Sequence, residues 1–247
     1  MIKGILFDCG GVLIHPASGE WLMPAGLEKI LGTERFEPDP EKLKQALARP
    51  LYLMDEGQLI TGLGHEYRIR QEFTRRMAED LSVPLTDGQV DAICRYLTYD
   101  DSKYAPYPDT ARALDRFADE YRIGFLSNAL PSMIRALVNH GLTDRLSTFT
   151  VSCMIGCQKP DAGIYRQALR EIGLPPQECV FVEDLHENLR TAGHLGIRTI
   201  RMMRDHYVTH PAPDFAWSGA AARDLNEVYD LVRAHNEGRL EITPCSD

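Results

Sequence analysis

Short apolar runs alternate with helical periods along much of this sequence, and this alternation limits the fold more than any other feature. Runs of strand length recur at residues 2–7, 123–126, 149–151, 180–182 and 197–202. Between the later runs, apolar residues recur three and four positions apart, as they do on one face of a helix. Strands and helices that alternate in this way form a parallel sheet with helices on both faces. The sequence therefore predicts a fold of the α/β class.

The segment at residues 15–104 interrupts this alternation, because it contains helical stripes and no convincing strand. Asp39 and Pro40 are typical of a helix cap followed by a proline in the first turn. We predict an all-helical cap domain at residues 15–104, inserted into an α/β core formed by residues 1–14 and 105–247. A cap inserted here would cover the carboxyl ends of the strands, where open parallel sheets bind ligands.

The tail of the chain predicts less regular structure. From about residue 205, proline and glycine in "THPAPDFAWSG" indicate a loop. A helix is expected next, with Leu225, Val228 and Val232 on one face. Beyond Asn236 we expect a frayed end.

The composition argues against several classes of protein. The chain has 247 residues, of which 44% are apolar and 26% charged, so it can bury the core of one large domain. A formal net charge of -9 argues against nucleic acid or a membrane surface as partners. No apolar stretch approaches the roughly 18 residues of a membrane span, and no signal-peptide pattern is found. We therefore expect a cytoplasmic protein.

The six cysteines stand at irregular spacings, and we expect buried, reduced thiols. Cys153 and Cys157 lack a second pair of ligands at zinc spacing. His186, Glu187 and His194 do not form the H-E-x-x-H pattern of a zinc-binding helix. The sequence therefore argues against zinc.

Polar residues follow four of the apolar runs. In chain order they are Asp8, Ser127, Asn128, Lys159, Glu183 and Asp184. Because the carboxyl ends of parallel strands meet at one edge of a sheet, we expect these side chains to converge. A carboxylate can attack phosphorus, a lysine and a hydroxyl can hold phosphoryl oxygens, and paired acids can hold magnesium. The cations would offset the repulsion between an anionic nucleophile and an anionic substrate.

Four segments of the sequence resemble the four motifs of the haloacid dehalogenase (HAD) superfamily. They are "ILFDCGGVL", "GFLSNA", "QKPDAGIY" and "VFVEDLHENLRTAGHLG". Their order and spacing resemble members with a Rossmann-like parallel-sheet core and a helical cap between the first two motifs. In the cap, the resemblance is confined to helical character and a "MDEGQL" loop.

The resemblance implies a magnesium-dependent phosphatase that hydrolyses a small phosphomonoester through an aspartyl-phosphate intermediate. Asp8 would be the nucleophile, and Lys159 would neutralise Asp8 and the substrate. The implied phosphate-binding residues are Ser127, Asn128, Gly10 and Gly11, and the implied magnesium ligands are Asp8, Gly10 through its carbonyl, Glu183 and Asp184. Asn188 is expected to order the loop of the fourth motif. The substrate would be a sugar phosphate or similar metabolite, and the protein a monomer or homodimer.

Gly10 departs from the phosphatase pattern, in which a second aspartate usually protonates the leaving oxygen and later activates water. Glycine can do neither, and losing a positioned acid and base costs about 10²–10⁴ in rate. A good leaving group, such as an anomeric or acyl phosphate oxygen, is the explanation that we favour. Alternatively, the cap or the substrate supplies the proton, or phosphatase activity is weak or lost. The D-x-G-G-V form resembles sugar-phosphatase-like members and the N-terminal domains of epoxide hydrolases.

Other classes remain open on the sequence. A haloacid dehalogenase would use Asp8 on carbon without magnesium, but it should lack the acidic pair as a metal site and usually carries a bulky residue at the position of Gly10. A mutase would depend more heavily on the missing second acid. A phosphate-binding regulatory module without turnover is the non-enzymatic alternative. Residues of the cap that could face the substrate are His15, Trp21, Met54 and Asp55; packing is the favoured role of Trp21 and Met54, and His15 is a candidate proton donor.

Overall fold

The computed structural model describes residues 1–19, 21–33, 36–43, 58–204 and 217–246. Six parallel strands form its main sheet, in the order β5-β4-β1-β6-β7-β8. The strands are β1 (Gly4–Phe7), β4 (Arg122–Ser127), β5 (Thr148–Val151), β6 (Cys179–Glu183), β7 (Arg198–Met202) and β8 (Ala220–Ala222). The first five lie on the apolar runs of the sequence, so the predicted parallel α/β sheet is confirmed.

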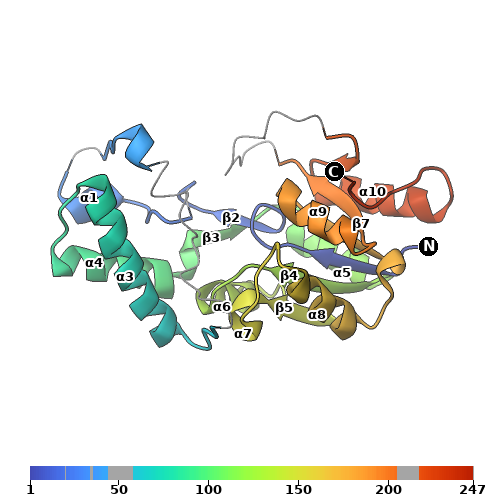
Figure 1. The fold of residues 1–247 in the computed structure, drawn as a ribbon, viewed down its shortest axis with the longest axis horizontal. Coiled ribbons are helices and arrows are strands. Elements are labelled where there is room, and N and C mark those ends of the chain that lie inside the picture. Colours follow the sequence, from blue (N-terminus) through green and yellow to red (C-terminus); the bar gives the residue numbers. More distant parts are fainter. Residues whose placement is uncertain (20, 34–35, 44–57, 205–216, 247) are drawn as a thin grey trace.

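Helices cover both faces of this sheet (Figure 1). The helices on the first face are α5 (Thr110–Ala118), α6 (Pro131–Asn139) and α10 (Leu225–Asn236), and those on the second are α8 (Ala162–Ile172) and α9 (His186–His194). Side chains alternate along each strand, so Ile5 and Phe7 of β1 join the first core and Leu6 joins the second. Shorter helices are α7 (Ser152–Ile155), η1 (Asp101–Lys103) and η2 (Pro176–Glu178).

The edge strand β8 is a feature that the sequence analysis missed. It consists of three alanines and pairs in parallel with β7, Ile200 opposite Ala220. Alanine is depleted in strands, and the run is too short to alternate visibly, so the sequence carries no strand signal here. The helix predicted after it is confirmed as α10, whose N-terminus is capped by the Asp224 side chain.

The frayed end expected beyond Asn236 is wrong for the described residues. Ile242 is buried in the first core, and the Thr199 amide donates to the Thr243 carbonyl at 3.3 Å. A Cβ on Gly193 of α9 would lie 2.7 Å from the Cys245 backbone nitrogen, so the tail packs directly on that helix. The few apolar residues of this tail are too widely scattered to show a helical period, and the sequence therefore carries no signal for this packing.

The segment predicted as a cap contains helices in the residues that the structure describes. Those with given bounds are α1 (Leu27–Leu31), α3 (Leu63–Leu81) and α4 (Asp87–Tyr99), and residues 40–43 are also helical. The amides of Glu41 and Lys42 donate to the Asp39 side chain, which confirms the predicted cap before Pro40. The apolar face of α4 is buried, and a capping box formed by Thr86 and Gln89 begins that helix.

A two-stranded antiparallel ribbon connects the lobes at the middle of the molecule (Figure 1). It pairs β2 (Ile14–Pro16) with β3 (Tyr104–Pro106). The sequence predicts no strand between residues 15 and 104. This prediction is wrong at the two ends of the segment, where β2 and β3 lie. Each strand has three residues and ends in proline, which weakens the strand signal in the sequence.

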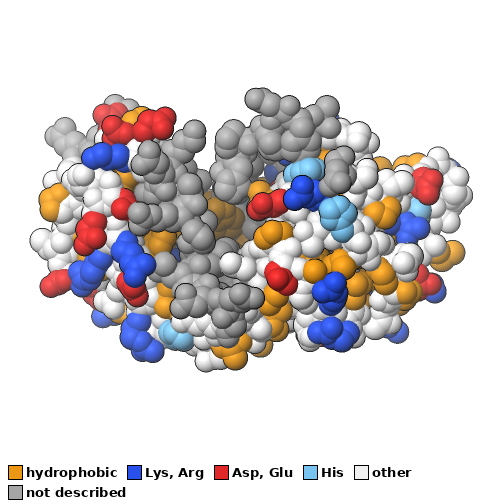
Figure 2. Space-filling model, viewed as in Figure 1, with side chains coloured by type: hydrophobic (Ala, Val, Ile, Leu, Met, Phe, Trp, Pro, Cys, Tyr) orange, Lys and Arg blue, Asp and Glu red, His pale blue; other side chains and the backbone are white. Residues whose placement is uncertain are grey.

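The surface carries charges of both signs. Figure 2 shows Lys, Arg, Asp and Glu side chains interspersed over the described part of one face. Among the helices that the structure describes, none combines the length and the apolar character needed to cross a bilayer.

Candidate functional site

The polar residues that follow the strands converge on one cavity at the carboxyl edge of the sheet. Asp8 follows β1, Ser127 ends β4, and Asp184 follows β6, and these three strands are neighbours in the sheet. Lys159 reaches the same cavity from the loop between α7 and α8. Asn128 and Gly10 also line it. The sheet order therefore brings together residues that are far apart in the chain.

Lys159 forms the centre of a buried ionic cluster. Its Nζ donates to Asp8 Oδ1 at 2.7 Å and to Glu183 Oε2 at 2.6 Å, and its side chain is 2% exposed. Burial, reinforced by the charge of Glu183, raises the pKa of Asp8 to about 6. Burial also raises the pKa of Glu183 to about 7. Burial alone lowers the pKa of Lys159, but the two carboxylates outweigh it and hold that pKa above its ordinary value.

Glu183 is fully buried and uses both of its carboxylate oxygens. Oε1 accepts from the amides of Asp184 and Leu185, at 3.1 and 3.2 Å. Oε2 accepts from Asn188 Nδ2 at 3.0 Å as well as from Lys159. These bonds hold Lys159 toward Asp8, and they order the loop after β6 through Asn188, as the sequence predicts.

The Asn128 side chain hydrogen-bonds with both the amide and the carbonyl of Lys159. Its Nδ2 donates to the Lys159 carbonyl at 2.9 Å, and its Oδ1 accepts from the Lys159 amide at 2.7 Å. The sequence analysis expects Asn128 to bind phosphate, and the structure gives its amide this positioning contact. Ser127 is buried, and its hydroxyl acts to lower the pKa of Asp8, against the larger effect of burial.

Gly11 makes room for Asp184. Its φ is 73°, a left-handed conformation that favours glycine. A Cβ at this position would overlap Asp184 Oδ2 and would lie 2.9 Å from Asp184 Cγ. The glycine therefore lets the Asp184 carboxylate approach the loop after β1.

The space above Gly10 is filled by Trp21. A Cβ on Gly10 would lie 3.1 Å from Trp21 Cζ2, tighter than an ordinary van der Waals contact. Trp21 also packs on Tyr104, with ring centroids 6.0 Å apart. The indole is thus both a packing residue, as expected, and part of the cavity wall. It lies in the region that a side chain at position 10 would enter.

Asp8, Glu183 and Asp184 form an acidic cluster that could hold a metal ion. One carboxylate oxygen from each lies within 4.8 Å of the others. Burial also raises the pKa of Asp184, and Lys159 supplies one ammonium against three carboxylates. A donor set made only of oxygens fits magnesium or calcium better than zinc.

The rest of the cavity wall is apolar, with one further cation. Trp21, Leu22, Tyr104, Leu130, Met133 and Leu185 supply the apolar surface, and Arg70 of α3 supplies the cation. The sequence analysis missed Arg70. The only local sign of its ion pair is a glutamate four residues earlier, Glu66. This spacing does not single out a functional arginine, because the exposed pair of Glu72 and Arg76 on the same helix has it too.

Of the other cap residues named from the sequence, the structure describes only His15. His15 belongs to β2 and does not line this cavity in the described part of the chain; its ring packs on Tyr107 with centroids 4.9 Å apart. Met54 and Asp55 lie outside the described residues.

The chain is similar to known proteins in sequence and in fold. The family model for haloacid dehalogenase-like hydrolases matches residues 2–196. Glyceraldehyde 3-phosphate phosphatase of Methanopyrus kandleri is 28% identical over 223 residues, which cover 84% of this chain and 86% of that protein. (S)-2-haloacid dehalogenase 4A of Burkholderia cepacia is 30% identical over 128 residues, 51% of this chain and 54% of that protein. A crystal structure of an L-2-haloacid dehalogenase shares the fold, with a TM-score of 0.66 at 22% identity over 94% of this chain and 100% of that one.

Proposed function

The chain belongs to the haloacid dehalogenase-like hydrolase family, and from this premise we propose that it is a magnesium-dependent phosphatase. Its substrate would be a small phosphomonoester with a good leaving group, hydrolysed through an aspartyl phosphate on Asp8. The similarity to a glyceraldehyde 3-phosphate phosphatase supports a small phosphorylated metabolite.

The acidic cluster is the observation that carries this proposal. Attack on carbon needs one carboxylate, and the contact between Lys159 and Asp8 would already serve it. The cluster instead gathers three buried or half-buried acids around one ammonium, with pKa values raised by burial. A divalent cation held by Asp8 and Asp184 would offset this excess of negative charge and that of a phosphate.

The first half of the reaction forms a covalent intermediate. An Asp8 oxygen attacks phosphorus, a new oxygen–phosphorus bond forms, and the bond from phosphorus to the leaving oxygen breaks. Lys159 offsets the charge of the phosphoryl oxygens, and the Ser127 hydroxyl, which lines the same cavity, would donate to one of them. Magnesium would supply further positive charge at the phosphoryl group. Because Gly10 offers no acid, the leaving oxygen has to depart without a proton from that position.

The second half releases phosphate and restores Asp8. Water attacks the phosphorus of the aspartyl phosphate, the bond between phosphorus and the Asp8 oxygen breaks, and the protons of the water leave with inorganic phosphate. Gly10 offers no base to activate this water, so dephosphorylation of Asp8 is expected to limit turnover of activated substrates. The Trp21 indole above Gly10 would narrow the approach of bulk water to this side of Asp8.

Phosphate release from p-nitrophenyl phosphate tests the proposal, because an aryl oxygen leaves with little acid assistance. We expect release that requires Mg²⁺, stops with EDTA, and is lost in Asp8→Asn. Asp115→Asn is the matched control, because the Asp115 side chain is 63% exposed and pairs only with a surface arginine in the described residues. It should keep wild-type activity.

The outcome that would overturn the proposal is an Asp8→Asn protein as active as the wild type, or release that is indifferent to EDTA. A dehalogenase is the second candidate, because Trp21 supplies bulk beside Gly10 where such enzymes usually carry a large side chain. Halide release from 2-chloropropionate in EDTA, lost in Asp8→Asn, would favour it. Tight phosphate binding without any turnover would instead favour a regulatory module.

Gly11→Ala is expected to remove the stabilisation by Mg²⁺. The left-handed φ costs alanine about 1–2 kcal/mol of folding free energy, and the methyl group also displaces Asp184. Gly32→Ala is the control, because Gly32 has a φ of 71° and open space around its Cβ position. Thermal unfolding should show both variants destabilised, with the rise in Tm on adding Mg²⁺ kept in Gly32→Ala and lost in Gly11→Ala. Equal rises in the two would contradict the role of Asp184.

A further inference from the structure

The cavity above Asp8 has a second polar end, formed by Arg70 of the cap helix α3. Arg70 is 9% exposed, and its Nε donates to Glu66 Oε1 at 2.8 Å. Its terminal nitrogens have no hydrogen-bond partner in the described residues. These nitrogens are not among the unpartnered polar atoms that are fully buried, so a solvent-sized group can reach them. Because Arg70 lines the cavity, its free edge is open to a ligand there.

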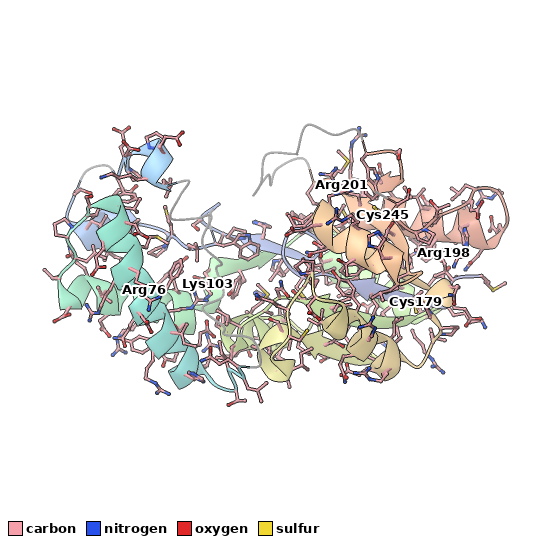
Figure 3. The ribbon with its side chains drawn as sticks, in the orientation of Figure 1. Arg76, Lys103, Cys179, Arg198, Arg201 and Cys245 are labelled. Carbon is pink, nitrogen blue, oxygen red and sulfur yellow. The ribbon has the colours of Figure 1, made fainter. Side chains whose placement is uncertain are left out.

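Glu66 fixes the orientation of this guanidinium and joins the cap to the core. Its carboxylate is fully buried and accepts from Arg70, from the Ser132 amide at 2.7 Å, and from the Ser132 hydroxyl at 2.6 Å. Ser132 lies in the first turn of the core helix α6. Lys103, labelled in Figure 3 beside the cap helices, donates to the same hydroxyl at 3.2 Å. Arg70 is therefore held in place before any ligand binds.

We propose that Arg70 binds a carboxylate of the substrate, so that the substrate is a phosphorylated carboxylic acid. This inference rests on the proposed function, because it assigns the phosphoryl group to the Asp8 end of the cavity. Much of the remaining lining of the cavity is apolar, with Trp21 and Met133 among its residues. That wall suits a short carbon skeleton between two anionic groups.

A carboxylate suits this end better than a second phosphate. Its two oxygens match the two terminal nitrogens of a guanidinium, which bind carboxylates as a fork. Glu66 already neutralises part of the charge of Arg70, so a monoanion fits the remaining charge better than a dianion. A negative group here would also favour the charged form of Lys103, whose pKa is held well below its ordinary value by burial and by Arg70.

A matched pair of substrates tests the proposal. 3-Phosphoglycerate and glycerol 3-phosphate differ by a carboxylate in place of a hydroxymethyl group. Neither compound has a good leaving group, so we expect slow turnover of both, with kcat/KM of the wild type favouring 3-phosphoglycerate by about 10- to 100-fold, the contribution of a hydrogen bond to a charged group. In Arg70→Gln this preference should fall to nearly one, chiefly through KM for 3-phosphoglycerate, and Arg70→Lys should restore part of it.

Arg76→Gln is the control for the loss of an arginine from α3. Arg76 pairs with Glu72 at the same spacing of four residues as Arg70 with Glu66, and its side chain is 55% exposed (Figure 3). Arg76→Gln should keep the wild-type ratio of the two kcat/KM values. A ratio that is one in the wild type, or that survives in Arg70→Gln, would overturn the proposal.

A binding measurement separates this inference from the proposed function. Calorimetric titration of the Asp8→Asn protein with each compound, in Mg²⁺, measures the preference without turnover. Tighter binding of 3-phosphoglycerate that is lost on adding Arg70→Gln supports the role of Arg70 even if no phosphate is released. Equal Kd values for the two compounds, in a protein that does release phosphate from p-nitrophenyl phosphate, would refute the role of Arg70 alone.

Discussion

Replacing Lys159 with methionine is expected to abolish phosphate release and to lower the free energy of unfolding by about 3–5 kcal/mol. The ammonium is the buried partner of both Asp8 and Glu183, at 2.7 and 2.6 Å. Methionine fills a similar volume but leaves two buried carboxylates facing each other without a cation. Urea denaturation in EDTA measures the change, because added metal would offset part of it.

Lys3→Met is the control for the loss of a lysine that pairs with a glutamate. Lys3 Nζ contacts Glu178 Oε1 at 2.8 Å, but its side chain is 54% exposed, so the pair contributes at most about 1 kcal/mol. A Lys159→Met protein as stable as Lys3→Met would show that the ionic cluster does not depend on its cation. Retained turnover would remove Lys159 from the proposed mechanism.

Restoring an acid at position 10 is expected to raise turnover of an alkyl phosphate only when Trp21 is shortened at the same time. A Cβ added to Gly10 would lie 3.1 Å from Trp21 Cζ2, so the side chain of Gly10→Asp alone is crowded by the indole. Gly10→Asp combined with Trp21→Ala frees that space. We expect the double variant to gain about 10²-fold in kcat on glycerol 2-phosphate, at the low end of general acid–base catalysis.

An aryl substrate distinguishes a gain in acid catalysis from a general gain in activity. p-Nitrophenolate leaves without a proton, so the gain on p-nitrophenyl phosphate should be much smaller than on glycerol 2-phosphate. Trp21→Ala alone measures the effect of opening the cavity. Equal gains on both substrates, or a full gain in Gly10→Asp alone, would contradict the idea that position 10 lacks an acid and is blocked by Trp21.

The core could be predicted from the sequence because its signal is local. The strands β1, β4 and β6 are buried on both faces and therefore read as continuous apolar runs. Where the fold departs from the prediction, the local signal is weak. The alanines of β8 and the prolines of the β2–β3 ribbon form strands because their neighbours in space supply the pairing.

The candidate site divides in the same way. Asp8 and Asp184 follow strands of one parallel sheet, so chain order and strand direction are enough to predict that they meet. Arg70 and Trp21 reach the cavity from the cap, and their positions depend on how the cap docks on the core. The contact of Glu66 with Ser132 that fixes this docking joins residues with no shared sequence pattern.

The central position of β1 has a consequence for synthesis of the chain on the ribosome. This first strand lies between β4 and β6, so neither side of it can pair until residues 122–127, and then 179–183, have been translated. The helices α3 and α4 are adjacent in sequence and pack on each other, so they can form before β1 has a strand to pair with. The strand that carries Asp8 toward the cavity is thus the first strand made and among the last to be enclosed.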